Sequence, residues 1–354
     1  MNRFARFSGL RRVLLPCGYG LALLFAWPAS ADEFLMFPNI TGAVRNVAAP
    51  DHKKKELEPT IDFFYSRTEG SVQVLAEFLL SRDENELERA QLGWTSAQGY
   101  TAWLGRFHTP ISYWNTAYHH GAYLQPSISR PGIAEYEDHG GIMPMHATGV
   151  LVDGGVELAP HRLVYSLSLG QGPTLEHSLE PFNLLSPRGN GKLSFAARVG
   201  LQSDESIANE YGFLLGYSDI PIVEEASNQI HQTIAGVYFN RETTRWRFLS
   251  EIIFLHTSFD VAQRQGSPTF ANGYAHAEYK FNPQWASYGR VEGSYHADNA
   301  YLSLFPDFTK SRAMLGARWS PIRNHAVKFE VSHNRRQDGD NYNELAVQWS
   351  MVFP

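Results

Sequence analysis

The densest group of side chains able to bind a metal or transfer a proton lies between residues 119 and 146. It comprises His119, His120, Glu135, Glu137, Asp138, His139 and His146. No two of these histidines have the spacing of a zinc motif with a catalytic glutamate between them. We therefore expect a polar loop with no metal and no cofactor, and a metal site stays open as an alternative.

The same stretch holds residue types that could catalyse hydrolysis. Ser127 or Ser129 could serve as a nucleophile, with His119 as base and Asp138 as the orienting carboxylate. No Gly-x-Ser-x-Gly elbow supports such a site. The sequence therefore predicts that the chain is not an enzyme, and a hydrolase is the less favoured alternative.

Two predicted strands must position these residues. The segment YTAWLGRF precedes the stretch from Thr109 to Met145, and HATGVLVDGGV follows it. The stretch contains four prolines and the aromatic residues Tyr113, Trp114, Tyr118, Tyr123 and Tyr136. Prolines disfavour a long helix or a strand, and the aromatic residues argue against disorder. The sequence thus predicts one long structured loop, and a loop of this length is normally functional.

The start of the chain has the pattern of a secretory signal peptide. Four arginines precede the apolar segment VLLPCGYGLALLFAW, and Ala29-Ser30-Ala31 forms a small-residue cleavage site. We expect cleavage after Ala31, which gives residues 1–31 as the signal and 32–354 as the mature domain. Because Cys17 is the only cysteine, the exported chain would have neither a disulfide nor a thiol nucleophile.

The remainder of the chain alternates strongly between apolar and polar residues. In KLSFAARVGLQ, Phe195 and Val199 lie on the face opposite Arg198, and in AVKFEVSHN, Phe329 and Val331 oppose Lys328. The whole chain has a formal charge of −6, so nucleic acid is an unlikely partner. Alternation without a long apolar run is typical of a transmembrane antiparallel β-barrel, and a soluble periplasmic β-protein is the alternative.

Short and long connections alternate along the chain, as in bacterial barrels with short periplasmic turns and long external loops. Fifteen segments have convincing strand patterns, and the weaker segment from Phe34 to Val44 brings the prediction to sixteen. The run DENELE is interpreted as an acidic connection. A barrel of this size should enclose a water-filled lumen.

The arrangement of signal, alternating strands, aromatic last strand and long third external loop resembles the Gram-negative general and solute-selective porins. The segment LGRFHTPISYW is similar to a strand-to-loop junction in relatives of phosphate-selective and other porins. One departure is that Pro354 follows Phe353, where these porins usually end in phenylalanine. The resemblance implies a sixteen-stranded barrel, often trimeric, whose third loop folds inward as a constriction.

The resemblance also implies passive diffusion of small hydrophilic solutes or ions through a channel in the outer membrane, with membrane lipids outside. A polysaccharide export channel and a barrel that sheathes an electron-carrying partner remain alternatives.

We expect the constriction to contain Arg106, His119, His120, Arg130, Glu135, Glu137, Asp138 and His139, and the lumen wall to contain Arg198, Arg247, Arg290, Arg318 and Lys328. Inward basic residues outnumber inward acids, which predicts weak anion preference or near neutrality; the alternative is that these charges pair and brace the barrel.

Overall fold

The computed structural model describes residues 33–48, 53–82, 85–119, 121–137, 140–182, 191–203, 206–225, 228–260, 267–339 and 341–354. Within Glu33–Pro354, sixteen antiparallel strands close into a barrel, as predicted. The predicted signal peptide lies outside the described residues. No helix among the described residues is long and apolar enough to cross a membrane.

The barrel is a meander in which each strand pairs with its neighbours in the chain. Its first half consists of β1 (Glu33–Arg45), β2 (Lys55–Glu69), β3 (Val72–Ser81), β4 (Asn85–Thr95), β5 (Thr101–His108), β6 (His146–Leu158), β7 (His161–Gln171) and β10 (Leu193–Ser203). Its second half consists of β11 (Ser206–Pro221), β12 (Gln229–Glu242), β13 (Trp246–Phe259), β14 (Thr269–Lys280), β15 (Trp285–Tyr295), β16 (Thr309–Trp319), β17 (His325–Arg336) and β18 (Tyr342–Met351). The weak first segment is indeed a strand, because β1 pairs with both β2 and β18 and so closes the barrel.

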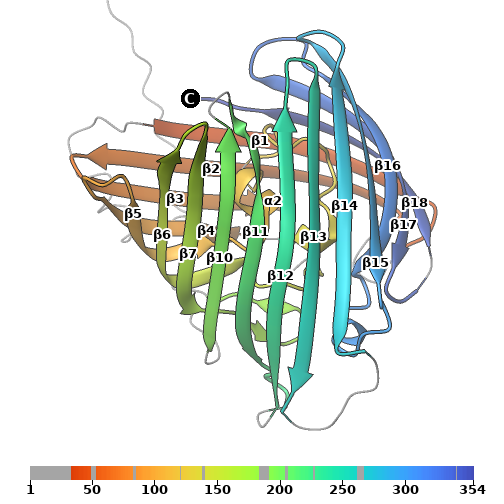
Figure 1. Ribbon diagram of the computed structural model, residues 1–354. Coiled ribbons are helices and arrows are strands. Elements are labelled where there is room, and N and C mark those ends of the chain that lie inside the picture. The colour runs from red at the N-terminus through yellow and green to blue at the C-terminus, as the bar shows by residue number, and fades with distance from the viewer. Residues whose placement is uncertain are drawn as a thin grey trace, which may run out of the picture. The chain divides into compact units, whose positions relative to one another are not determined.

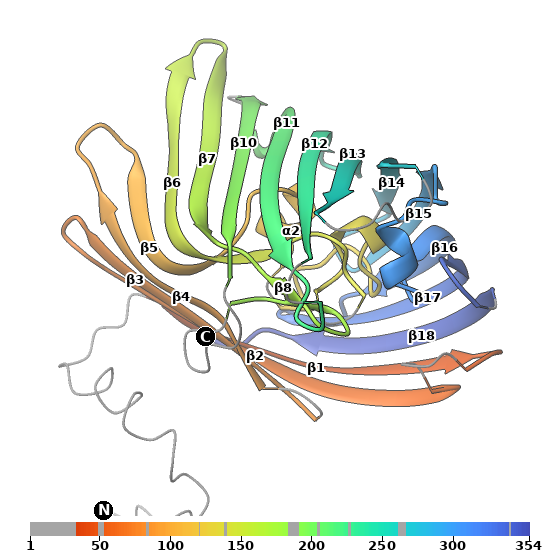
Figure 2. The same cartoon turned by 90° about the horizontal axis from the view of Figure 1, so that it is seen from below.

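Short elements occupy three of the long connections. The helix α2 (Tyr113–Ala117) and the turn η1 (Gly132–Ala134) lie between β5 and β6, the hairpin β8 (Thr174–Leu175) and β9 (Leu179–Glu180) between β7 and β10, and η2 (Leu302–Leu304) between β15 and β16. Figures 1 and 2 show the strands side by side in the wall, with α2 and the gold to yellow loop around it on the inner side.

One predicted connection is wrong. The run DENELE was interpreted as a loop, but β4 begins at Asn85, so Glu86, Leu87 and Glu88 belong to the strand. The pairing of β3 with β4 passes from Glu77–Arg89 to Phe78–Leu87 and leaves Glu88 as an extra residue in a bulge. A bulge interrupts the period-two pattern on which strand prediction depends.

The two faces of the wall differ as the alternation predicted. Large apolar side chains such as Phe195, Val199, Phe329 and Val331 are exposed on the outside, whereas Glu330 and Lys328 are buried inside. Successive side chains of a strand point to opposite faces, so local sequence alone sets this division.

Part of the lumen is filled by an apolar core. Ile111, Trp114, Ile142 and Met143 of the long loop pack in one buried cluster with inward residues of β11 to β14, which include Leu214, Ile230, Ile234, Leu249, Ile253 and Phe270. Burial of this apolar surface stabilises the folded loop inside the barrel, and the loop fills part of the lumen that was predicted to hold water. Water-accessible space is left at the sides of the loop.

Candidate functional site

The first part of the loop is held by one buried carboxylate of the wall. Glu251 of β13 accepts hydrogen bonds from the backbone N–H groups of Tyr113 (2.8 Å) and Trp114 (3.0 Å) and from the hydroxyls of Ser112 (3.1 Å) and Tyr274 (2.6 Å). The first N–H groups of a helix have no partner within the helix. Glu251 therefore supplies the acceptors that the start of α2 lacks.

Further wall carboxylates hold the backbone N–H groups of the rest of the loop. The contacts are Asp62 with Gly121 (2.9 Å), Glu330 with Ile128 (3.0 Å) and Glu292 with Gly132 (2.6 Å). The carboxylates lie on β2, β17 and β15, which are far apart in the sequence. Long-range contacts of this kind fix the path of the loop.

Wall cations bind the loop carbonyls. Arg290 donates to the carbonyls of Ser129 (3.0 Å) and Arg130 (2.9 Å), Arg312 donates to the Arg130 carbonyl, and Lys328 donates to the Ala122 carbonyl (2.6 Å). Arg290 and Lys328, two residues predicted for the lumen wall, thus use their charges to hold the loop. Charge-assisted hydrogen bonds are stronger than neutral ones.

The two serines proposed for hydrolysis also anchor the loop. Ser127 Oγ donates to the Ser129 carbonyl (2.8 Å) and accepts from Arg290 (2.9 Å). Ser129 Oγ donates to Glu330. Asp138, the carboxylate of that hypothesis, lies outside the described residues.

The structure places Arg106 and Arg130 on the inner side of the barrel. Arg106, with 2% of its surface exposed, forms an ion pair with Glu86 and donates to the carbonyls of Glu88 (3.1 Å) and Phe182 (3.2 Å). Arg130 stacks on the ring of Tyr136 at 3.8 Å. The positive charge of each guanidinium group is therefore partly balanced by these contacts.

Among the acids predicted for the constriction, Glu135 lines a polar cavity, and Glu137 is buried and contacts His146. His120, Asp138 and His139 lie outside the described residues.

The remaining predicted wall residues are mostly paired as well. Arg198 lies 3.9 Å from Glu210 and donates to Thr116 Oγ1 at 2.5 Å. Arg247 contacts Glu242 (3.2 Å) and Glu278 (3.6 Å). Arg318 lies over the ring of Tyr123 at 4.9 Å.

Two polar cavities border the loop. One, of about 290 Å³, lies between the loop and β1 to β4, β16 and β18, and its lining includes Asp62, Glu88, His119 and Arg130. The other, of about 540 Å³, lies next to β3 to β7, β10 and β11, and its lining includes Arg89, His108, Asp153 and Arg198. Both cavities have charged side chains in their linings.

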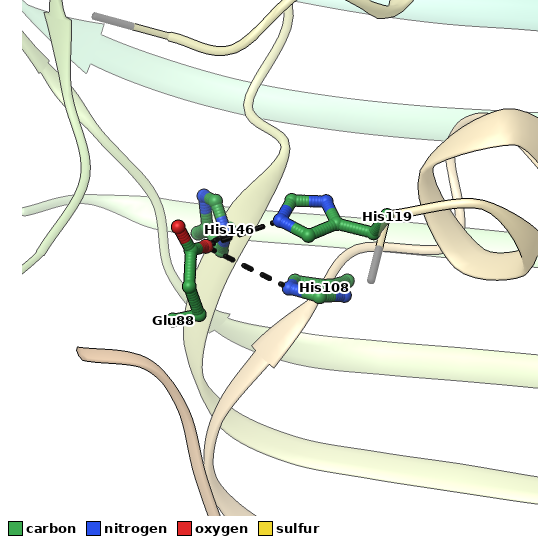
Figure 3. A group of neighbouring side chains, drawn as sticks. All are labelled: Glu88, His108, His119 and His146. Atoms are coloured by element: carbon green, nitrogen blue, oxygen red, sulfur yellow. Dashed lines mark hydrogen bonds and ion pairs between the residues drawn. The ribbon is translucent and has the colours of Figure 1, made fainter. Parts of the chain in front are cut away.

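Four buried side chains meet between these cavities (Figure 3): Glu88 of β4, His108 at the end of β5, His119 of the loop and His146 at the start of β6. Glu88 Oε2 lies 2.9 Å from His146 Nε2, 3.1 Å from His119 Nε2 and 3.9 Å from His108 Nε2. The rings of His108 and His119 stack with centroids 3.5 Å apart. Burial lowers the pKa of His119 to about 3, although hydrogen bonding to Glu88 opposes this shift.

Of these four residues, the sequence singled out His119 and His146 but missed Glu88 and His108. Glu88 was missed because the bulge conceals its strand, and His108 because it lies between a strand and a loop. A usable signal was present: β5, which ends in Arg106, Phe107 and His108, leads directly into the stretch with the other histidines.

Gly105 allows the backbone conformation of β5 just before these residues, since its φ is +132° and an added Cβ would lie 2.0 Å from the Ala90 carbonyl oxygen.

No family model and no curated protein matches this sequence. Solved structures do match. An anion-selective porin from Comamonas acidovorans superposes with a TM-score of 0.61 at 9% identity, covering 91% of this chain and 99% of that one. For OmpF of Salmonella typhi the TM-score is 0.60 at 11% identity, with 91% and 97% covered, and for the outer-membrane channel DcaP of Acinetobacter baumannii it is 0.54 at 10% identity, with 91% and 96% covered. The chain therefore has the sixteen-stranded β-barrel fold of the outer-membrane porins.

Proposed function

We propose that this chain is a channel for passive diffusion of small hydrophilic solutes or ions across the outer membrane of a Gram-negative bacterium. The observation that carries the proposal is a closed barrel with apolar residues exposed outside and charged residues lining cavities inside. An apolar outer surface suits contact with lipid, and a polar interior suits water and solutes. The porin fold agrees with this function.

The loop from Thr109 to Met145 would form the constriction. Its anchors on β2, β13, β15 and β17 hold it against the inner wall. The polar cavities beside it would carry the solutes, while its apolar side closes the rest of the lumen. Cleavage after Ala31 and association as a homotrimer remain predictions, which mass spectrometry of the membrane-extracted protein and native mass spectrometry would check.

Conductance in a planar lipid bilayer tests the channel and the constriction together. Replacing Tyr118 to His139 by a short Gly-Ser linker should raise the single-channel conductance, because it removes the loop residues that line the cavity of about 290 Å³. A control that shortens the connection between β13 and β14 should leave conductance near the wild-type value. No channel activity from folded wild-type protein would refute the function, and unchanged conductance after loop removal would place the loop outside the solute path.

Ion selectivity is proposed to be weak, with slight anion preference or near neutrality. Arg106, Arg198 and Arg247 each lie within 4.0 Å of a carboxylate. These neighbouring carboxylates therefore neutralise much of the excess positive charge on the inner wall. The reversal potential in a salt gradient measures the preference. Strong cation selectivity would contradict the proposal.

A further inference from the structure

Beyond the channel function, we propose that Glu88, His108, His119 and His146 form a binding site for a divalent transition metal ion of the zinc class. Three imidazoles and one carboxylate are a ligand set that zinc accepts in proteins. Their four ligand atoms all lie within 4.8 Å of one another, and all four residues are buried.

The four ligand atoms would have to move only slightly to bind a metal ion. Zinc bonds to nitrogen and oxygen are about 2.0 to 2.2 Å long, which places the ligand atoms of a tetrahedral site about 3.3 Å apart. The separations of Glu88 Oε2 from the three Nε2 atoms are 2.9, 3.1 and 3.9 Å and so bracket this value. In Figure 3 the histidine rings converge on the Glu88 carboxylate from different segments of the chain.

The hydrogen bonds around His119 orient its Nε2 atom as a metal ligand. The Asn115 side-chain amide donates to the carbonyls of Thr109 (3.2 Å) and Met145 (2.9 Å), which fixes Oδ1 as the acceptor facing His119 Nδ1 at 2.8 Å. His119 Nδ1 therefore carries a proton. The other ring nitrogen, Nε2, lies 3.1 Å from Glu88 Oε2 and is the atom positioned to ligate a metal ion.

His146 is oriented in a similar way by a carboxylate. Glu137 accepts from the backbone N–H of His146 (3.1 Å) and contacts His146 Nδ1 at 2.6 Å, so Nε2 faces Glu88. A ligating histidine commonly donates its other ring N–H to a carboxylate or carbonyl, which orients the ring and increases the basicity of the ligand. Asn115 is such a partner of His119, and Glu137 is such a partner of His146.

An ion can reach the cluster from the lumen. Glu88 and His119 line the cavity of about 290 Å³, and His108 lines the cavity of about 540 Å³. The cluster thus lies at the boundary between two polar spaces. A bound ion would link β4, β5 and β6 to the loop and tie the constriction to the wall.

Metal binding is tested on the folded mature protein in detergent, first stripped with a chelator. Calorimetric titration with zinc chloride should show one site per chain, and cobalt(II) should give the intense visible bands of a four-coordinate ion. No zinc binding, or a cobalt spectrum of an octahedral ion, would overturn the proposal, because the cluster would then share only protons. The cobalt spectrum needs no variant, so the test does not depend on mutant folding.

Variants then locate the site. His108→Gln and His119→Gln should each abolish the zinc site, and Glu137→Gln, which keeps all four ligands, should weaken binding about 10-fold to 100-fold. His276→Gln is the matched control, since His276 is also buried on the inner wall but lies outside the cluster. His231→Gln removes a histidine within 2.8 Å of two aspartates elsewhere on the barrel. Zinc binding that survives both cluster variants, or that is lost in His231→Gln, would refute the assignment.

Discussion

Glu251 offers the sharpest test of how the loop is held inside the barrel. Glu251→Gln replaces one carboxylate oxygen by an amide N–H₂ group of similar size. The best amide orientation keeps the oxygen that accepts from Ser112, Trp114 and Tyr274 and loses the acceptor for the Tyr113 N–H. A buried donor left without an acceptor costs about 1–3 kcal/mol, so we expect this loss in the free energy of unfolding.

Glu251→Ala should cost more, because it removes both oxygens. The backbone N–H groups of Tyr113 and Trp114 then both lack an acceptor, which predicts a loss of about 2–6 kcal/mol at about 1–3 kcal/mol for each donor. Glu157→Gln is the control: it changes an exposed carboxylate whose ion pair with Arg162 (3.2 Å) is at the surface, and such a pair contributes about 0–1 kcal/mol.

Guanidinium unfolding in phospholipid vesicles measures these free energies, and protease cleavage within the loop reports whether the loop has been released. The expected order of stability is wild type and Glu157→Gln, then Glu251→Gln, then Glu251→Ala. If both Glu251 variants matched the Glu157→Gln control and the loop stayed protected, the proposed role of the buried carboxylate would be wrong.

Three further predictions test the wall. Val331→Arg, at an exposed outward position (52% exposed), should lower the unfolding free energy by about 2–4 kcal/mol, whereas Val156→Arg, near the β6–β7 turn, should cost about 0–1 kcal/mol; equal costs in the same vesicle titration would contradict the proposed membrane position. Gly105→Ala should lose about 1–3 kcal/mol through backbone strain, and a refolding yield and stability equal to wild type would show that β5 adapts without cost. Arg318→Glu should move the reversal potential toward cation preference, because Arg318 lines a cavity of about 570 Å³ at the turn end of the barrel; an unchanged potential would place that cavity outside the ion path.

The wall of the barrel could be predicted from the amino-acid sequence. Alternation of apolar and polar residues in strands such as KLSFAARVGLQ assigned the outward and inward faces. The alternation of short and long connections predicted sixteen strands, including the weak segment that forms β1. These features are local, because the geometry of a strand alone sends neighbouring side chains to opposite faces. The position of a long structured loop before β6 was equally visible from its prolines and aromatic residues.

The contacts of the inward residues could not be predicted in this way, because they depend on the folded barrel. Arg290 and Lys328 were predicted as lumen charges, yet closure of the barrel places them where the loop carbonyls need donors. Glu88 meets His119 and His146 because a bulge in β4 and the return of the loop bring together residues that are far apart in the chain. Neither alternation nor motif spacing contains this information, since such contacts depend on strand register, barrel closure and loop docking acting together.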